Sequence, residues 1–153
     1  MSAPLPFTLL PDSAEIGADG TLHIGGCSVL DVAAEFGTPL FIYDEDHLRS
    51  RAREAVAAFG PGVAYASKAF LCTAVARLVH EEGMDIDVST LGEYHIARAA
   101  GVPAELLVVH GNIKSEAEIR VALGAGVGRV VVDSFEVLDR IDAIVADGFA
   151  APD

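Results

Sequence analysis

Four short runs of β-branched and other apolar residues recur along this chain at nearly even intervals. They begin at residues 63, 85, 106 and 129, and each is followed by a stretch whose apolar residues have the three-and-four spacing of an amphipathic helix. Because the runs are apolar on both faces and are joined by helices, we expect a parallel sheet with right-handed crossovers. The sequence therefore predicts an α/β protein. The predicted strands are 63–66, 85–88, 106–109 and 129–132.

The predicted helices carry capping signals at both ends. Thr90 with Glu93, and Ser115 with Glu118, fit the capping box, in which two side chains satisfy unpaired backbone amides reciprocally. Ser134 is a candidate cap for the last helix. Glycines that can adopt a left-handed backbone without a Cβ penalty follow the helices, at Gly83, Gly101, Gly126 and Gly148.

The region before the repeat predicts different elements. Glycines on both sides of 21–24 indicate a small hairpin, and 29–36 indicates a short helix. Leu40–Asp44 is typical of another strand, and Asp44 can cap a helix from about Glu45 to Phe59. We therefore expect residues 1–37 to belong to a β-rich domain and residues 38–153 to form the α/β part.

Two parallel architectures fit this repeat: an open doubly wound sheet and the first half of an eight-stranded barrel. The periodicity does not separate them. A dinucleotide-binding sheet requires a Gly-x-Gly-x-x-Gly turn after its first strand, and the turn here is Ser67–Phe70, which contains no glycine. The glycine fingerprint of dinucleotide binding is therefore missing.

Polar side chains follow each predicted strand at its carboxyl end, the edge of a parallel sheet where ligands bind. Capping is the favoured alternative for Thr90, Asp133 and Ser134. Lys68 needs a chemical explanation, because the chain has two lysines beside eight arginines. A Schiff base requires a primary amine that can lose its proton, whereas arginine stays charged. The strand-end residues are Lys68, Asp87, Ser89, His110, Asn112, Asp133 and Ser134.

The composition limits the partners and the compartment. A net charge of −13 repels nucleic acid and anionic lipid, so neither is an expected partner. We identify no secretory signal and no apolar stretch of the roughly 20 residues that span a bilayer. Cys27 and Cys72 lack the spacing of a zinc site or a disulfide framework, and we expect no metal. These features predict a cytoplasmic protein.

Five blocks of this sequence, in order and at matching spacing, resemble the diaminopimelate decarboxylases. This family belongs to the alanine-racemase-like, fold-type III decarboxylases that use pyridoxal 5'-phosphate. The blocks extend over most of residues 38–147. They are Thr38–Asp44, Tyr65–Cys72, Asp87–Glu93, His110–Ser115 and Val131–Ser134.

The resemblance implies a (β/α)8 (TIM) barrel with pyridoxal phosphate attached to Lys68 at the barrel mouth. Asp87 would lie beside the attachment point, and His110, Asn112 and Ser134 would line the same mouth as cofactor-binding residues. The implied activity is decarboxylation of the amino acid meso-2,6-diaminopimelate to L-lysine in lysine biosynthesis, by a homodimer. The family commonly has asparagine where this chain has Ile113, so this chain lacks the amide that could hydrogen-bond at that position.

The resemblance covers only the N-terminal portion of such an enzyme. A complete barrel needs about 250 residues, so this chain is expected to end after about four strands and to be inactive alone. One alternative is a related decarboxylase acting on ornithine, arginine or carboxynorspermidine. Another is a non-catalytic half-barrel that regulates a full-length relative through its open sheet edges.

Overall fold

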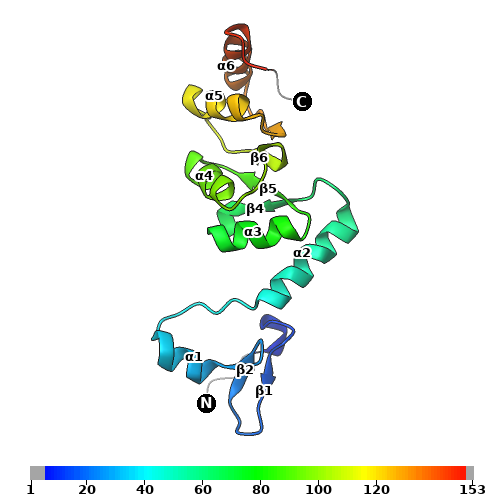
Figure 1. Ribbon diagram of the computed structural model, residues 1–153, viewed down its shortest axis with the longest axis vertical. Helices are drawn as coiled ribbons and strands as arrows, with labels where there is room; N and C mark the ends of the chain where they lie inside the picture. The colour runs from blue at the N-terminus through cyan, green and yellow to red at the C-terminus, as the bar shows by residue number, and fades with distance from the viewer. Residues whose placement is uncertain (1–5, 151–153) are drawn as a thin grey trace. The chain divides into compact units, whose positions relative to one another are not determined.

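The structure, a computed structural model, describes residues 6–150. Contacts between residues divide the chain into two compact units, Met1–Arg51 and Ala52–Asp153, and the division falls within helix α2 (Glu45–Phe59) (Figure 1). The predicted domains, 1–37 and 38–153, reach beyond the described residues at the two ends of the chain. That division into domains stays a prediction.

The described residues of the first unit form a short 3-10 helix (Phe7–Leu9), a small antiparallel sheet and one complete α-helix. The strands β1 (Glu15–Ile16), β2 (Leu22–Ile24) and β3 (Cys27–Ser28) pair in that order, and α1 (Val29–Phe36) follows directly. The predicted hairpin and short helix are therefore confirmed. The predicted strand at 40–44 is wrong, because this segment pairs with no described strand.

Asp44 links the start of α2 to the hairpin region of the first unit. Its Oδ1 accepts a hydrogen bond from the backbone N–H of His47 at 3.0 Å, which makes it the predicted helix cap. Its Oδ2 accepts from the hydroxyl of Ser13, and that hydroxyl oxygen accepts from the Gly25 N–H at 2.8 Å. The Ser13 hydroxyl, followed by the His47 N–H, holds the pKa of Asp44 below its ordinary value of 3.8.

These contacts make the stability of the fold dependent on the ionisation of Asp44. Because the folded-state pKa is lowered, the contribution is fully present above pH 3.8 and is lost as the pH falls through the folded-state pKa. In the wild type, the urea concentration at the midpoint of unfolding should fall as the pH decreases below 3.8. We expect this fall to be smaller in Asp44→Asn and in Ser13→Ala. Asp19, whose pKa is lowered by Thr21, adds a separate part, which Asp19→Asn should remove additively. An unchanged acid limb in Asp44→Asn would contradict the prediction.

The second unit alternates strands and helices, as the repeat predicts. All four predicted strands form, although β7 ends two residues before the predicted limit of 132, and the class is confirmed as α/β. No helix among residues 6–150 is both long and apolar enough to cross a membrane. The elements after α2 are β4 (Ala64–Ala66), α3 (Thr73–Glu81), β5 (Asp85–Val88), α4 (Leu91–Ala99), β6 (Leu107–Val109), α5 (Glu116–Ala125), β7 (Arg129–Val130) and α6 (Phe135–Ala146), with short 3-10 helices at Ser67–Ala69 and Ala104–Leu106.

The order of the four strands separates the two architectures that the sequence leaves open. They are parallel and lie in the order β4-β5-β6-β7, which is also their order in the chain. A doubly wound sheet reverses its strand order at a switch point, whereas a barrel adds each strand beside the previous one. The sheet therefore has the arrangement of half a (β/α)8 barrel.

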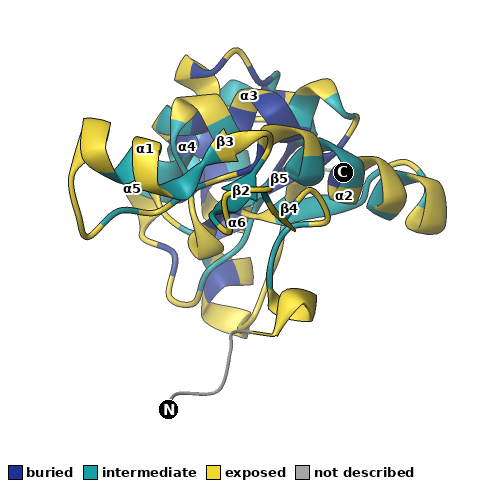
Figure 2. Ribbon diagram, turned by 90° about the horizontal axis from the view of Figure 1, so that it is seen from below, coloured by how far each residue is buried: buried dark blue, intermediate teal, exposed yellow. Residues whose placement is uncertain are grey.

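The two faces of β5 differ in chemistry. Ile86 and Val88 are at most 1% exposed on the face where α3 and α4 pack. Asp85 and Asp87 occupy the other face, because successive side chains of a strand alternate. The expectation that the strands are apolar on both faces is wrong for β5. Figure 2 shows the matching division on α3, which has both buried and exposed residues.

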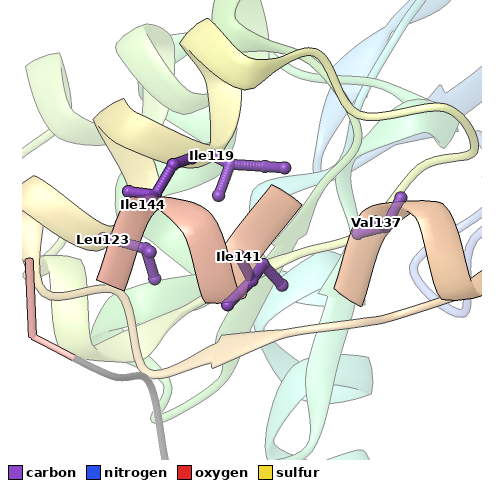
Figure 3. Close-up of a cluster of buried hydrophobic side chains, with 5 residues drawn as sticks. All are labelled: Ile119, Leu123, Val137, Ile141 and Ile144. Carbon is purple, nitrogen blue, oxygen red and sulfur yellow. The ribbon is translucent and has the colours of Figure 1, made fainter. Parts of the chain in front are cut away.

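An apolar cluster packs the last two helices, α5 and α6, against each other. Ile119 and Leu123 of α5 pack against three residues of α6, and Val130 of β7 packs on the cluster (Figure 3). The capping boxes at Thr90 and Ser115 are both present, and Gly126 ends α5 in the left-handed conformation. The residues from α6 are Val137, Ile141 and Ile144.

Candidate functional site

Lys68 lies directly beyond the carboxyl end of β4. It is exposed within the 3-10 turn Ser67–Ala69, and this turn contacts β5. Ala66, the last residue of β4, is in register with Asp87 of β5. The turn therefore places the lysine at the same edge of the sheet as Asp87.

Asp87 and His110 meet at this edge. His110 Nδ1 lies 3.3 Å from Asp87 Oδ2, and the His110 backbone N–H donates to the Val88 carbonyl at 2.8 Å, so the loop after β6 continues the ladder with β5. The other oxygen, Asp87 Oδ1, is buried without a hydrogen-bond partner among the described residues. A buried carboxylate oxygen without a donor is costly, so a bound donor at this position would be stabilising.

Asn112 lies in the same loop and, with His110, lines a cavity of about 210 Å³. Tyr94 of α4 and Val121 of α5 also line it, which places the cavity on the helix-covered face of the sheet. Asp87 lies on the opposite face, and neither Lys68 nor Ser134 lines the cavity. His110 therefore contacts Asp87 and also lines, with Asn112, the cavity on the helix-covered face of the sheet.

Ser134 acts as a helix cap. Its hydroxyl oxygen accepts a hydrogen bond from the Val137 N–H at 3.3 Å, at the start of α6, and the residue is exposed. This is the capping arrangement that the sequence favours for this position. A contact between Ser134 and a cofactor stays a prediction.

Lys114 also lies at this edge, and it was not among the predicted site residues. Its side chain is 3% exposed, and Nζ donates to the Gly111 carbonyl at 2.6 Å and lies 3.7 Å from Asp133 Oδ1. The available signal was the scarcity of lysine, since Lys114 and Lys68 are the two lysines of the chain. The residues described contain no group of three or more His, Cys, Asp or Glu side chains placed to hold a metal ion.

Ile113 has a backbone conformation that suits asparagine better than isoleucine. Its φ is 55°, in the left-handed region, and its side chain is 83% exposed. We expect Ile113→Asn to raise the free energy of unfolding by about 1 kcal/mol, because asparagine tolerates this region and little apolar burial is lost. Urea unfolding measures the gain. Ile113→Val keeps the β-branch and should give none; an equal gain in both variants would refute backbone strain as the cause.

Comparison with known proteins identifies a family to which residues 45–151 are similar. Residues 45–151 match the family described as "Pyridoxal-dependent decarboxylase, pyridoxal binding domain". The diaminopimelate decarboxylase of Mycobacterium tuberculosis is 50% identical over 130 residues, which are 84% of this chain and 29% of that protein. That of Corynebacterium efficiens is 42% identical over 144 residues, 93% of this chain and 31% of that protein. The chain spans less than a third of the length of these relatives.

Solved structures give the same result. Diaminopimelate decarboxylase from M. jannaschii in complex with L-lysine superposes with a TM-score of 0.84 at 30% identity, covering 90% of this chain and 33% of that one. A lysine/ornithine decarboxylase from Vibrio vulnificus, complexed with putrescine, gives 0.71 at 30% identity, covering 87% and 36%. Together with the match over residues 45–151, these findings show that the chain belongs to the pyridoxal-dependent decarboxylase family.

Proposed function

We propose that this chain supplies the cofactor-attaching half-barrel of a decarboxylase that converts meso-2,6-diaminopimelate to L-lysine and CO2 in lysine biosynthesis. The single observation that carries the substrate is the 50% identity to the M. tuberculosis diaminopimelate decarboxylase over 84% of this chain. The M. jannaschii relative, whose structure contains L-lysine, supports the same product. Lys68 is the proposed attachment point for pyridoxal 5'-phosphate.

The residues present at the strand ends fit this cofactor. Lys68 offers a primary amine beside β5, and the neighbouring Ser67 Oγ and Asp87 Oδ1 are buried atoms without partners among the described residues. When bound, pyridoxal phosphate supplies a ring that withdraws electrons from the carbon that loses CO2. Buried polar atoms without partners at the strand ends are costly, and a bound polar group that supplies their hydrogen bonds would remove that cost.

Each proposed residue has a separate task. Lys68 holds the cofactor through its amine, and Asp87 places negative charge beside that nitrogen, with His110 held against the carboxylate. Asn112 and Ser134 would offer an amide and a hydroxyl for hydrogen bonds. The protein's own contribution is to orient the reacting group and to fix charge close to it.

The proposal extends to the assembly and its compartment. We expect a cytoplasmic homodimer that acts on an amino acid, as the family resemblance implies, and the net charge of −13 is unfavourable for binding nucleic acid. A second candidate is a decarboxylase of another basic amino acid. The likeness to the V. vulnificus lysine/ornithine decarboxylase specifically favours it.

Product analysis with the full-length protein tests the function. It is incubated with pyridoxal phosphate and, separately, with meso-diaminopimelate, L-ornithine, L-arginine and carboxynorspermidine, and CO2 and amine products are quantified. L-lysine from diaminopimelate, at the highest kcat/KM of the four, is the expected result. Faster turnover of ornithine would favour the second candidate. The 153-residue chain alone is expected to show negligible turnover.

A further inference from the structure

We propose that Lys114 is a positioning residue that anchors the loop after β6, so that His110 keeps its place against Asp87 beside the cofactor. The loop comprises residues 110–114, between β6 and the capping residue of α5. The inference rests on the proposed function for its consequence. The anchoring itself follows from the contacts of Lys114.

The first set of contacts closes the loop on itself and on β5. The Lys114 ammonium donates to the Gly111 carbonyl at 2.6 Å. Gly111 has a φ of 103°, and a Cβ there would lie 2.8 Å from the Ser89 carbonyl oxygen, so this part of the loop lies tightly against the end of β5. The lysine therefore holds a backbone segment that already has little room to move.

The second set of contacts ties the loop to the next strand and helix. The Lys114 ammonium lies 3.7 Å from Asp133 Oδ1, just after β7, and its backbone carbonyl accepts from Arg140 Nη1 of α6 at 2.6 Å. Both the side chain and the backbone of Lys114 are thus held by the segment that carries Ser134. Lys114 therefore connects the loop after β6 to the segment after β7, and Gly111 of the same loop lies against the end of β5.

Burial makes these contacts specific. An ammonium that is 3% exposed has lost most of its hydration, and it is tolerated only when acceptors replace the water. An uncharged side chain such as methionine fills similar space but leaves the Gly111 carbonyl and Asp133 without their donor. The loop that carries His110 then loses its link to the end of β7, while the surface ion pairs of the helices are unchanged.

The test compares Lys114→Met with a matched control, Arg120→Met. Arg120 of α5 forms its ion pairs elsewhere, with Glu116 and Asp147, and lies over the Phe149 ring. Pyridoxal phosphate affinity is measured by absorbance with the full-length protein, and hydrogen exchange of amides 110–114 is measured without cofactor. We expect Lys114→Met to weaken affinity about tenfold, the equivalent of one charge-assisted hydrogen bond, and to speed exchange in the loop. Arg120→Met should change neither.

Two results would overturn the inference: unchanged loop exchange in Lys114→Met, or faster exchange with unaltered cofactor affinity, which indicates a purely structural lysine. If the wild-type protein takes up no cofactor, the proposed function fails, and the exchange data alone then decide the anchoring. If Lys114→Met does not fold, Asp133→Asn is the second variant. It removes the ion-pair partner of Lys114, and it changes a side chain that is 31% exposed and is therefore less disruptive to the core. It is expected to weaken affinity in the same direction by a smaller factor, and wild-type affinity would count against the inference.

Discussion

Replacing Lys68 with arginine is expected to abolish covalent attachment of pyridoxal phosphate and to leave the fold intact. Arginine keeps the positive charge and a long side chain but does not lose a proton at any working pH, so it forms no Schiff base. Lys68 is exposed, so the exchange creates no cavity in the core. Borohydride reduction followed by peptide mass analysis should find the trapped cofactor on the peptide containing Lys68 in the wild type and none in Lys68→Arg.

The control addresses non-specific labelling of amines. Arg77→Lys introduces an exposed lysine on α3, away from the carboxyl ends of the strands, and it should gain no label. Lys114, the second native lysine, is 3% exposed and engaged with Gly111, so it should stay unlabelled as well. Three results would refute Lys68 as the attachment point. They are undiminished total labelling of the Lys68→Arg variant, labelling of Lys114 equal to that of Lys68, and equal labelling of the new lysine in the Arg77→Lys variant.

Elements encoded by neighbouring residues were predictable from the sequence. The capping boxes at Thr90 and Ser115 form because each needs only a partner three residues away. The alternation of strands and helices in the second unit follows from the short repeat, but the repeat alone did not decide the order of the strands within the sheet. Local signals therefore predicted the elements of the second unit, whereas the structure was needed for their order in the sheet.

Elements that depend on distant partners were less predictable. Leu40–Asp44 has the composition of a strand, yet no described strand pairs with it, and strand formation requires such a partner. At the open edge of the sheet, β7 ends at Val130, although the Val131 N–H still donates to the Val109 carbonyl at 2.9 Å. Apolar composition alone does not define where pairing ends.

The same distinction applies to the site. The rule that ligands bind at the strand ends directed attention to this edge, where Asp87 and His110 lie together because both positions follow from strand register; their role in binding a cofactor stays a prediction. The role of Lys114 was not predictable, because a sequence does not reveal that a lysine is buried or that its partner, Asp133, comes from the next strand–helix unit. Distances between separate loops arise only from the folded sheet.

The largest loss of stability is expected from Gly128→Ala, at the entry to β7. A Cβ at this position would lie 2.0 Å from the Glu105 carbonyl oxygen and 3.0 Å from its carbon, both backbone atoms that no side-chain rotation can move. The strands β6 and β7 must separate at their amino ends, weakening the contact between the Gly128 N–H and the Ala104 carbonyl, now 3.3 Å. We expect a loss of about 3 kcal/mol in the free energy of unfolding by urea.

The matched control for this clash is Gly92→Ala, inside α4. A Cβ there would meet only Thr90 Oγ1, at 3.7 Å, and alanine favours a helix over glycine by up to about 1 kcal/mol. The two substitutions add the same methyl group, so opposite signs would show that close approach of two backbones, not the methyl itself, determines the cost. A loss below 1 kcal/mol in Gly128→Ala would mean that the segment at Glu105 moves freely. The amino ends of β6 and β7 would then be less rigidly held than their pairing in the sheet indicates.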